Sequence, residues 1–508
     1  MQTPREISPV PLWILIFLQA GISASSLVVE IVAGRMIAPY VGMSLYTWTA
    51  IIAVVLAGFS AGHWWGGRIA ARETGHALRL TGWTMVAAAC ATAGATVLLR
   101  SVSGPVLETI AQPLAAILAL SAIAFFLPSL FAGVPAPVLT VAAMRGRPQS
   151  ERALGAMFAA GALGAIAGTL LAGFLFVPWL GSVRTLLVIA AVYALAAVLC
   201  FWLGRASRDE HVVASAALGI AVLIGAGALS LPAVCDRESS YYCIRTVSLS
   251  ADPQQPVHLM VVDHLAHGVS GGEAPRTMYT DHAALLDALP RMRMARSDFT
   301  SFHIGGGSYS VPRAWADRGI TGITVAEIDP EVTAQAVDDF WFDPASATVL
   351  HRDARMALRD SRQIFDVIVG DAFTDIAVPE HLVTLEFFRL VSDRLAPGGV
   401  FAMNLIDNVD RMQALAAVMV TLREVFPSVE VWTEARPPMP GERRIFVLLA
   451  SEEDSPVSAV DAAAPDPKRF QVLHPAFLDD VIRQKQARIL TDDHAPLGYL
   501  MGLEPLID

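Results

Sequence analysis

The chain has 508 residues, of which 54% are hydrophobic and 16% are charged. Soluble globular proteins carry about 25% charged residues, so this composition excludes a protein that is soluble over its whole length. The formal net charge of −11 argues against a nucleic-acid partner, and the 12 His and 4 Cys form no cluster with metal-ligand spacing, so no metal is expected.

The hydrophobic residues are concentrated in the first half of the chain. Residues 11–234 contain no lysine and few acids, whereas residues 235–508 have an ordinary globular composition. A bilayer core about 30 Å thick needs roughly 20 apolar residues of helix. Seven runs are long enough, at 11–33, 46–67, 82–99, 112–143, 153–179, 183–203 and 212–232. We therefore expect a polytopic membrane domain over residues 1–234, with the lipid bilayer as a partner.

The fourth run, 112–143, is longer than one crossing needs and contains Pro128, Pro135 and Pro137. Proline removes a backbone hydrogen bond and bends a helix. One kinked helix and a helix followed by a re-entrant turn both fit this run. Two short crossings here would reverse the side on which the rest of the chain emerges.

Arginines in short loops indicate orientation, because they resist translocation. The nine arginines expected on one side are Arg5, Arg68, Arg72, Arg79, Arg145, Arg147, Arg152, Arg205 and Arg208, and the three on the other are Arg35, Arg100 and Arg184. We therefore expect a multi-pass protein of the cell (inner) membrane with a cytoplasmic N-terminus and a C-terminal half on the outer side. Cys235 and Cys243 can pair as a disulfide in an oxidising space or remain free thiols.

Small residues recur every four positions in two of the apolar runs. They are Gly58, Gly62 and Gly66 in the second run, and Ala156, Ala160, Gly164 and Gly168 in the fifth. Such faces let helices approach closely. Packing within the bundle is the first interpretation, and the seam of a homodimer is the alternative.

From residue 299 onward, short apolar runs alternate with helical stretches of roughly ten residues. The expected strands are "FTSFHI", "GITVAEID", "ATVLHRD", "FDVIVGD", "GVFAMNL", "VEVWTE" and "RRIFVLLA". This alternation predicts an α/β domain of Rossmann type over 298–508, with a doubly wound, mainly parallel sheet. Residues 235–297 are expected to form a small antiparallel β cap and a connecting helix, and 451–467 a flexible loop.

Polar residues stand where the expected parallel strands end, and such strand ends form the ligand crevice of these sheets. The first strand ends in Gly305, Gly306, Gly307 and Ser308, the second in Glu327 and Asp329, the third in Asp353 and Ala354, and the fourth in Asp371. Glycines allow close approach to a ligand, and an acid about 20 residues later can accept both hydroxyls of a ribose. Because there is no GxxxxGK[ST] phosphate loop, this pattern favours an adenosyl ligand with a cationic group.

At these positions the chain resembles the spermidine synthase (polyamine aminopropyltransferase) family, whose domain is methyltransferase-like. The resemblance covers about 238–501 and rests on "ESSYYCIR" (238–245), "VVD" (261–263), "IGGG" (304–307), "EIDP" (327–330), "RDAR" (352–355), "FDVIVGDAF" (365–373), "VPEHLVTLEFF" (378–388) and "LTDDHAPLGYL" (490–500). With its apolar first half, including "EIVAGRMIAPYVG" (30–42) and "SLYTW" (44–48), the whole chain resembles the membrane-anchored spermidine synthase-like branch.

The resemblance implies S-adenosylmethionine or its decarboxylated form as co-substrate, a small-molecule amine such as putrescine as acceptor, and methylthioadenosine as the product left behind. It implies that Glu327 holds the ribose and Asp353 the adenine, while Asp371, with Asp375 as a second acid, is catalytic. Tyr241, Asp263 and His282 are the implied substrate-binding residues.

Three positions depart from the family pattern. The acid that directly follows the glycines in soluble members is Ser308 here, which cannot pair with a cation. The second catalytic acid, expected three residues after Asp371, is Thr374, and Asp375 follows one residue later. His282 stands where the acceptor channel has a tyrosine.

Three functions remain open from the sequence. The first is a membrane-bound aminopropyltransferase-like transferase that can serve polyamine biosynthesis. The second uses the same pocket to cleave or cyclise S-adenosylmethionine or to transfer its methyl group, for which a lone base such as Asp371 is enough. The third is a non-enzymatic membrane sensor or carrier.

Overall fold

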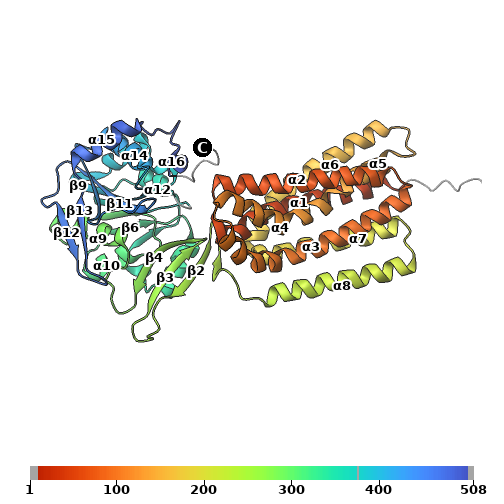
Figure 1. Cartoon of the computed structure of the whole chain (residues 1–508), viewed down its shortest axis with the longest axis horizontal. Coiled ribbons are helices and arrows are strands. Elements are labelled where there is room, and N and C mark those ends of the chain that lie inside the picture. Colours follow the sequence, from red (N-terminus) through yellow and green to blue (C-terminus); the bar gives the residue numbers. More distant parts are fainter. Residues whose placement is uncertain (1–9, 375–376, 502–508) are drawn as a thin grey trace, which may run out of the picture. The chain divides into compact units, whose positions relative to one another are not determined.

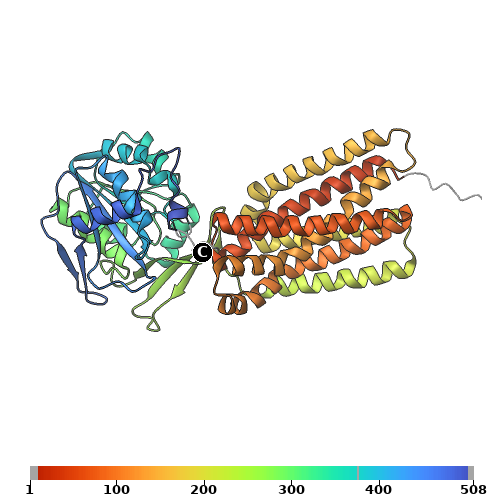
Figure 2. The same cartoon turned by 45° about the horizontal axis from the view of Figure 1, so that its top comes forward.

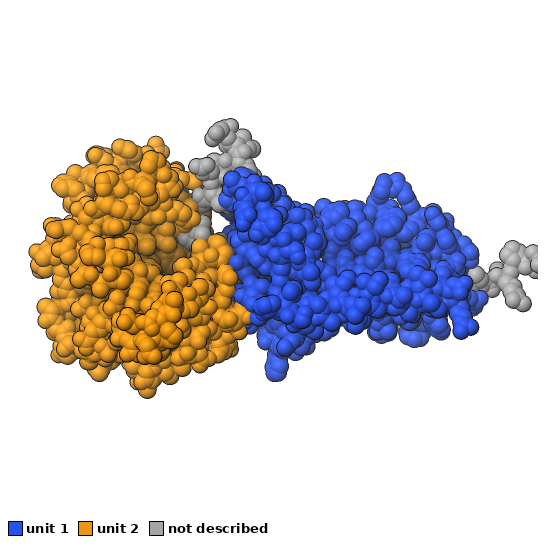
Figure 3. Space-filling model, turned by 60° about the horizontal axis from the view of Figure 1, so that its bottom comes forward, with its two compact units in different colours: residues 1–234, 238–243 blue, residues 235–237, 244–508 orange. Residues whose placement is uncertain are grey.

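The computed structural model describes residues 10–374 and 377–501. The chain divides into two compact units, coloured separately in Figure 3. The helical unit comprises residues up to Val234 together with Glu238–Cys243, and the α/β unit comprises Cys235–Arg237 and the residues from Ile244 onward. Each unit is described by itself below.

The helical unit is a bundle of long apolar helices (Figure 1). In chain order these are α1 (Leu12–Val41), α2 (Leu45–Ala70), α3 (Thr74–Thr109), α4 (Pro113–Gly133), α5 (Pro135–Met144), α6 (Ser150–Leu171), a π-helical turn η1 (Ala172–Phe176), α7 (Val177–Leu203) and α8 (Arg208–Ser230). Helix α1 packs on α6 and α7, and α2 packs on α4. Helix α8 lies at the margin of the bundle, against α3 (Figure 2).

Six segments of the described chain are long and apolar enough to cross a membrane. One of them, Ser150–Leu203, has 54 residues, more than twice the roughly 20 that one crossing needs. It is broken at Gly181, whose φ of 74° and ψ of 172° are not helical. Because α6 lies against α1 while α7 lies against α3, the two parts are separate rods. This gives seven rods, the number expected from the sequence, and their insertion in a bilayer stays a prediction.

The fourth apolar run forms one bent rod. Val134, between α4 and α5, keeps right-handed helical angles of −60° and −40°, and Pro113–Met144 counts as a single segment. Of the alternatives for this run, the kinked helix is the one that the structure adopts.

The stripes of small residues are used for packing inside the helical unit. A Cβ on Gly62 would lie 2.2 Å from the carbonyl oxygen of Leu130 in α4. On α6, a Cβ on Gly164 would lie 2.2 Å from the carbonyl oxygen of Ala20 in α1. Real side chains do not come this close, so both stripes are needed where helices touch within the unit. The homodimer stays a prediction.

Cys235 and Cys243 are disulfide-bonded, while Cys90 and Cys200 are free. Of the two alternatives for the first pair, the structure therefore has the bridge.

A four-stranded antiparallel cap precedes the main sheet, and all of its strand residues except Glu238 and Cys243 belong to the α/β unit. Its strands are β1 (Arg237–Glu238), β2 (Cys243–Ser248), β3 (Val257–Val262) and β4 (Leu265–Gly271), in that spatial order. Helix α9 (Asp281–Met294) follows the cap and packs on β9 and β11 of the main sheet. The expected β cap and connecting helix are both present.

The main sheet has nine strands in the order β12-β13-β10-β11-β9-β8-β5-β6-β7. They are β5 (Ser301–Ile304), β6 (Ile323–Ala326), β7 (Thr348–Leu350), β8 (Phe365–Gly370), β9 (Leu395–Asn408), β10 (Ser428–Glu434), β11 (Arg443–Ser451), β12 (Ala459–Ala462) and β13 (Lys468–Val472). Strands β9, β8, β5, β6 and β7 are parallel. The chain runs outward from β5 through β6 to β7 and then returns to β8 on the other side of β5, so the switch point lies between β5 and β8.

Helices cover both faces of this sheet (Figure 1). The helices after the first strand are α10 (Ser310–Asp317), α11 (Pro330–Asp339), α12 (Ala354–Asp360), α13 (Leu385–Asp393), α14 (Gln413–Arg423), α15 (Pro475–Lys485) and α16 (Leu497–Leu500), with 3-10 turns η2 (Pro344–Ser346) and η3 (Glu380–Leu382). Helices α9 and α10 pack together, as do α13, α14 and α15 in sequence. The expected Rossmann-type α/β fold of the C-terminal part is confirmed.

Two expectations for this unit are wrong. The sheet is not mainly parallel, because β11, β10, β13 and β12 join it antiparallel. Residues 451–467 are not wholly loop, because β12 (Ala459–Ala462) lies within them and pairs with β13. Strand β12 lies at the edge of the sheet and has no buried residue, so no apolar pattern marks it in the sequence.

Candidate functional site

The ends of β5 and β8 meet at the switch point of the sheet. Ile304 lies opposite Gly370 in the parallel register, and the amide of Asp371 donates to the carbonyl oxygen of Ile304 at 2.9 Å. Gly305 has a φ of 90°, and a Cβ there would lie 2.6 Å from the carbonyl oxygen of Asp371. Glycine is therefore required at this position, both by its backbone angle and by the close approach of the next strand.

The carboxylate of Asp371 is held from one side and open on another. Asn404 in β9 donates from Nδ2 to Asp371 Oδ1 at 2.9 Å. His282, the second residue of α9, places Nε2 3.9 Å from Asp371 Oδ2. The Asp371 side chain is 30% exposed, so a small molecule in the crevice can reach it.

Asn404 is a functional candidate that the sequence reasoning missed. It is only 3% exposed, and its Oδ1 has no hydrogen-bond partner among the described residues. A buried amide oxygen without a partner is costly, and such groups call for an explanation. The available signal was a single polar residue within the apolar strand "FAMNLI".

Glu327 is tied to the glycine turn. Its Oε2 accepts from the amide of Gly306 at 2.8 Å, and its Oε1 accepts from the amide of Asp329 at 2.9 Å. The side chain is 6% exposed, and burial raises the pKa of this carboxyl although these amides oppose the shift. Glu327 therefore fixes the loop that follows β5. Gly307, with a φ of 51°, faces open space where a Cβ would meet nothing within 4 Å.

Ser308 belongs to a chain of hydroxyl groups. Its Oγ lies 2.6 Å from Ser310 Oγ, which lies 3.0 Å from Ser270 Oγ in β4. Ser308 is 4% exposed, and a Cβ on Gly268 would lie 2.1 Å from its Oγ. The side chain that follows the three glycines is thus neutral, and through Ser310 it links the glycine turn to the cap by hydrogen bonds.

The two other strand-end acids cap helices. Asp329 is 1% exposed and accepts from the amide of Glu331 at the start of α11, at 3.0 Å. Asp353 accepts from the amide of Met356 at 2.9 Å, and its Oδ2 lies 2.8 Å from His381 Nε2. Ala354 is the first residue of α12 and is buried. Adenine recognition by Asp353 and Ala354 stays a prediction.

The three residues predicted to bind substrate do not all lie near Asp371 in the α/β unit. His282 stands next to Asp371, and Asp263 lies between β3 and β4, 7% exposed and with a φ of 53°. Tyr241 belongs to the helical unit, where its ring lies 6.1 Å from that of Tyr242. Asp375 lies outside the described residues. The α/β unit thus brings Gly305, Glu327, Asp371 and His282 to one edge of the sheet.

The spermine/spermidine synthase domain matches residues 318–458. A polyamine aminopropyltransferase of Vibrio vulnificus is 30% identical over 211 residues, which cover 39% of this chain and 68% of that protein. A probable polyamine aminopropyl transferase of Bifidobacterium longum is 28% identical over 241 residues, covering 44% of this chain and 52% of the relative. The chain thus spans about half the length of the Bifidobacterium protein.

A solved structure also aligns with part of the chain. A probable spermidine synthase from Corynebacterium glutamicum aligns over 49% of this chain and 93% of its own, with 23% sequence identity and a TM-score of 0.43. The sequence match to the Vibrio protein extends over more than two thirds of that relative, and the domain match includes β6, β7, β8 and β9. The chain belongs to the spermine/spermidine synthase family.

Proposed function

We propose that the α/β unit is an alkyl (aminopropyl) transferase, with a sulfonium nucleoside of the S-adenosylmethionine type as donor and a small amine as acceptor. The observation that carries this proposal is the position of Asp371 at the switch point, with one carboxylate oxygen held by Asn404 and the other open to the crevice. Family membership and the names of the relatives support the same reaction class.

The proposed reaction needs no metal. The lone pair of a neutral amine attacks the carbon next to the sulfonium, a C–N bond forms, and the C–S bond breaks with its electron pair going to sulfur. The products are methylthioadenosine and an alkylated ammonium, whose proton passes to Asp371. The unpartnered Oδ1 of Asn404 can accept a second hydrogen from the attacking nitrogen and orient its lone pair.

The donor would lie over the glycine turn. Gly307 leaves open space there, and Glu327 holds the turn through the amide of Gly306. The remaining lone pairs of Glu327 are the proposed acceptors for the ribose hydroxyls. Burial of this carboxylate strengthens such hydrogen bonds because water does not compete for it.

We further propose that the helical unit crosses the cell membrane seven times, with the N-terminus in the cytoplasm and the α/β unit on the outer side. The proposal is supported by the seven apolar rods, by the nine-to-three distribution of arginines and by the disulfide between Cys235 and Cys243. An enzyme in that place would need its adenosyl donor outside the cytoplasm.

The test of the reaction is an assay of the purified full-length protein with labelled S-adenosylmethionine or its decarboxylated form, with and without putrescine and other primary amines. Methylthioadenosine that forms only when an amine is added supports transfer. Saturable donor binding without turnover of any kind would instead support a sensor or carrier and would overturn the enzymatic proposal.

A second reaction is favoured by Ser308. Its hydroxyl is neutral and bound to Ser310, so it gives no charge partner to the aminopropyl ammonium of a decarboxylated donor. The pocket is then equally suited to cleavage or cyclisation of S-adenosylmethionine or to methyl transfer. Methylthioadenosine formed without an amine would support cleavage, and S-adenosylhomocysteine would support methyl transfer.

A further inference from the structure

We infer that His381 selects the nucleobase of the sulfonium donor, by fixing the Asp353 carboxylate as a hydrogen-bond acceptor for an amino group on that base. His381 is a positioning residue in this role, because it acts through Asp353. The inference rests on the proposed function, which places a nucleoside along the carboxyl ends of the parallel strands. Neither the strand-end pattern nor the family resemblance assigns a role to this histidine.

The order of the parallel strands places the nucleobase at the end of β7. These strands lie side by side in the order β8, β5, β6, β7. Asp371 follows β8, the glycine turn follows β5, and Glu327, the proposed ribose acceptor, follows β6. A nucleoside whose sulfur lies near Asp371 and whose ribose lies at Glu327 therefore carries its base towards β7. The ends of β6 and β7 adjoin, because the amide of Glu327 donates to the carbonyl oxygen of Leu350, the last residue of β7, at 3.1 Å.

Asp353 and His381 form a hydrogen-bonded pair at this place. Asp353 lies three residues after β7, and its Oδ1 accepts from the amide of Met356 at 2.9 Å. Its Oδ2 lies 2.8 Å from His381 Nε2. An ionised carboxylate only accepts hydrogen bonds, so Nε2 of His381 carries the hydrogen between them. Both side chains stay accessible to a ligand, with exposed fractions of 31% for Asp353 and 48% for His381.

Two donors on different oxygens fix the plane of the Asp353 carboxylate. Each carboxylate oxygen has two acceptor sites, and Met356 and His381 each occupy one of them. The sites that remain can accept only from an N–H or O–H group. Adenine offers such a group in its 6-amino substituent, whereas a purine with hydrogen at that carbon offers none. The purine without the amino group would leave the carboxylate short of a partner, and that loss weakens its binding.

Arg355 holds the backbone of His381 in place. Its Nη1 donates to the carbonyl oxygen of His381 at 3.0 Å. The same guanidinium pairs with Asp492, with Nη1 2.7 Å from Oδ1 and Nη2 2.7 Å from Oδ2. Thr384 Oγ1 also donates to Asp492 Oδ1, at 2.7 Å. Bidentate pairs of this kind fix geometry, so three segments that are distant in the sequence together hold η3, the turn that carries His381.

Two nucleosides that differ only in one amino group test the selection. Methylthioadenosine and its analogue with hydrogen in place of the 6-amino group are titrated into the full-length protein, and each Kd is measured by calorimetry. We expect methylthioadenosine to bind about tenfold to 100-fold more tightly, because hydrogen bonds to a charged group contribute that much. Equal affinities would overturn the inference and leave donor binding standing. Binding of neither nucleoside would instead refute the proposed donor site, and the inference with it.

Two variants ask whether His381 causes the preference. His381→Leu removes the donor to Asp353, so methylthioadenosine should bind about tenfold more weakly and the affinity ratio of the two nucleosides should fall. His381→Gln keeps an N–H group and should restore most of the ratio. In both variants kcat at saturating donor should stay within about twofold of the native value, because the amine attacks at the other end of the nucleoside. A native ratio in a folded His381→Leu variant, or a His381→Gln variant no better than His381→Leu, would contradict the inference.

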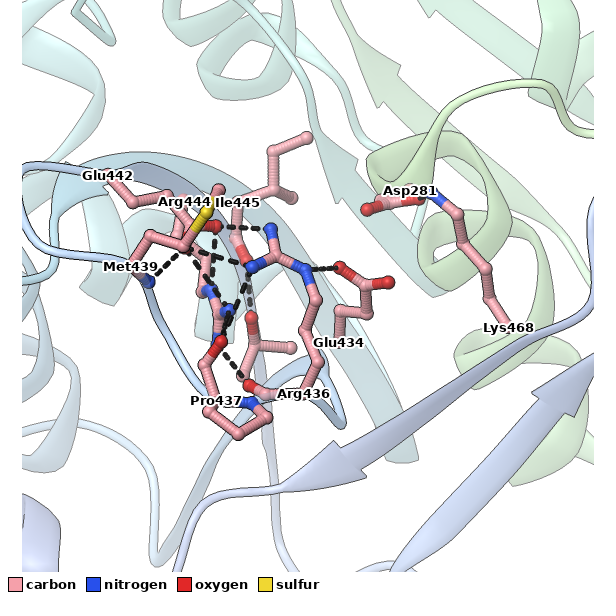
Figure 4. A network of polar contacts seen from close by, with 10 residues as sticks. Asp281, Glu434, Arg436, Pro437, Met439, Glu442, Arg444, Ile445 and Lys468 are labelled. Carbon is pink, nitrogen blue, oxygen red and sulfur yellow. Dashed lines mark hydrogen bonds and ion pairs between the residues drawn. The ribbon is translucent and has the colours of Figure 1, made fainter.

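Arg355→Gln tests the support of His381 against a matched control. It breaks the pairing with Asp492 and should lower the affinity ratio as His381→Leu does. The control is Arg436→Gln in the turn between β10 and β11, which β9, β8, β5 and β6 separate from β7 in the sheet. Arg436 Nε lies 2.6 Å from Glu434 Oε2, and its Nη1 lies 3.0 Å from Glu442 Oε2 (Figure 4). The control should keep the native ratio, and an equal loss in both variants would attribute the effect to stability and overturn the inference.

Discussion

The two oxygens of Asp371 have different surroundings, and this asymmetry gives the residue its proposed role. Oδ1 accepts from Asn404, while Oδ2 faces His282 at 3.9 Å, which is too long for a hydrogen bond. One oxygen is thus fixed, and the other can take the proton of an attacking amine. An arrangement of this kind orients a base without using up its acceptor capacity.

Asp371→Asn keeps the shape of the side chain and removes the base. We expect kcat to fall about 100-fold to 10,000-fold, because general bases contribute that much, while donor binding measured by calorimetry changes little. The control is Asp479→Asn on α15, an exposed aspartate paired with Arg423, which should keep full activity. Unchanged turnover in Asp371→Asn would remove this residue from the proposed mechanism.

Asn404→Leu tests whether the amide orients Asp371. We expect kcat to fall about tenfold or more with donor affinity preserved, since only the geometry of the base and of the attacking nitrogen is lost. A variant that lost donor binding and thermal stability together would show that Asn404 is required for folding and not for orientation.

The glycine turn is the element that brings the strand ends together. Gly305→Ala adds a Cβ 2.6 Å from the carbonyl oxygen of Asp371 at a φ of 90°. Gly398→Ala is a matched control, because Gly398 has a φ of 73° but open space around its Cβ position. The control should cost about 1 kcal/mol of stability from backbone strain alone, and Gly305→Ala should cost more and reduce turnover. Equal thermal unfolding of the two variants would show that the contact with Asp371 does not constrain the turn.

Strand β5 carries a buried histidine that makes the α/β unit sensitive to acid. His303 is 2% exposed, lies 3.2 Å from Ser301 Oγ and packs on Trp315, and burial lowers its pKa to about 3. An unfolded histidine has a pKa near 6.5, so the unfolded chain binds a proton as the pH falls below 6.5 while the folded chain does not until about pH 3. Stability is therefore complete above pH 6.5 and decreases as the pH falls from there towards 3.

At pH 5 this histidine alone should lower the free energy of unfolding by about 2 kcal/mol relative to pH 7.5. His303→Gln retains a hydrogen-bonding side chain but no titration, so its melting temperature should fall less between the two pH values than that of the native chain. Other groups, such as His267, titrate alike in both proteins and cancel in the comparison. Equal shifts would show that His303 is not the source.

The contrast between β5 and β12 explains how much of this unit the sequence could predict. Strand β5 is buried at all four positions and followed by glycines, so its apolar run and its end are both visible in the sequence. Strand β12 has no buried residue and forms only because its backbone pairs with that of β13. The same holds for the site. Gly305, Glu327 and Asp371 follow from strand ends, whereas the pairing of Arg355 with Asp492 depends on tertiary contacts between residues 137 positions apart.

At the scale of the whole molecule, the proposed location depends on whether the number of crossings is odd or even. The kink at Val134 leaves Pro113–Met144 as one rod, and the break at Gly181 divides Ser150–Leu203 into two. Both features are needed to reach seven, because splitting the first or joining the second would give an even number. Gly181 lies within α7, four residues after it begins, and its positive φ interrupts the helical angles there.

A reporter fused after Asp508 tests the proposed side directly. Alkaline phosphatase folds only where disulfides form, whereas a fluorescent protein of the cytoplasmic type is bright only inside, so the two fusions should give opposite signals. We expect phosphatase activity at this position, and fluorescence from a fusion before Met1. The matched variant Cys235→Ser should lose the disulfide without changing the reporter signal, because seven apolar rods and the arginine distribution set the orientation. A fluorescent C-terminal fusion would overturn the seven-crossing arrangement and would place the donor pocket where adenosyl donors are made.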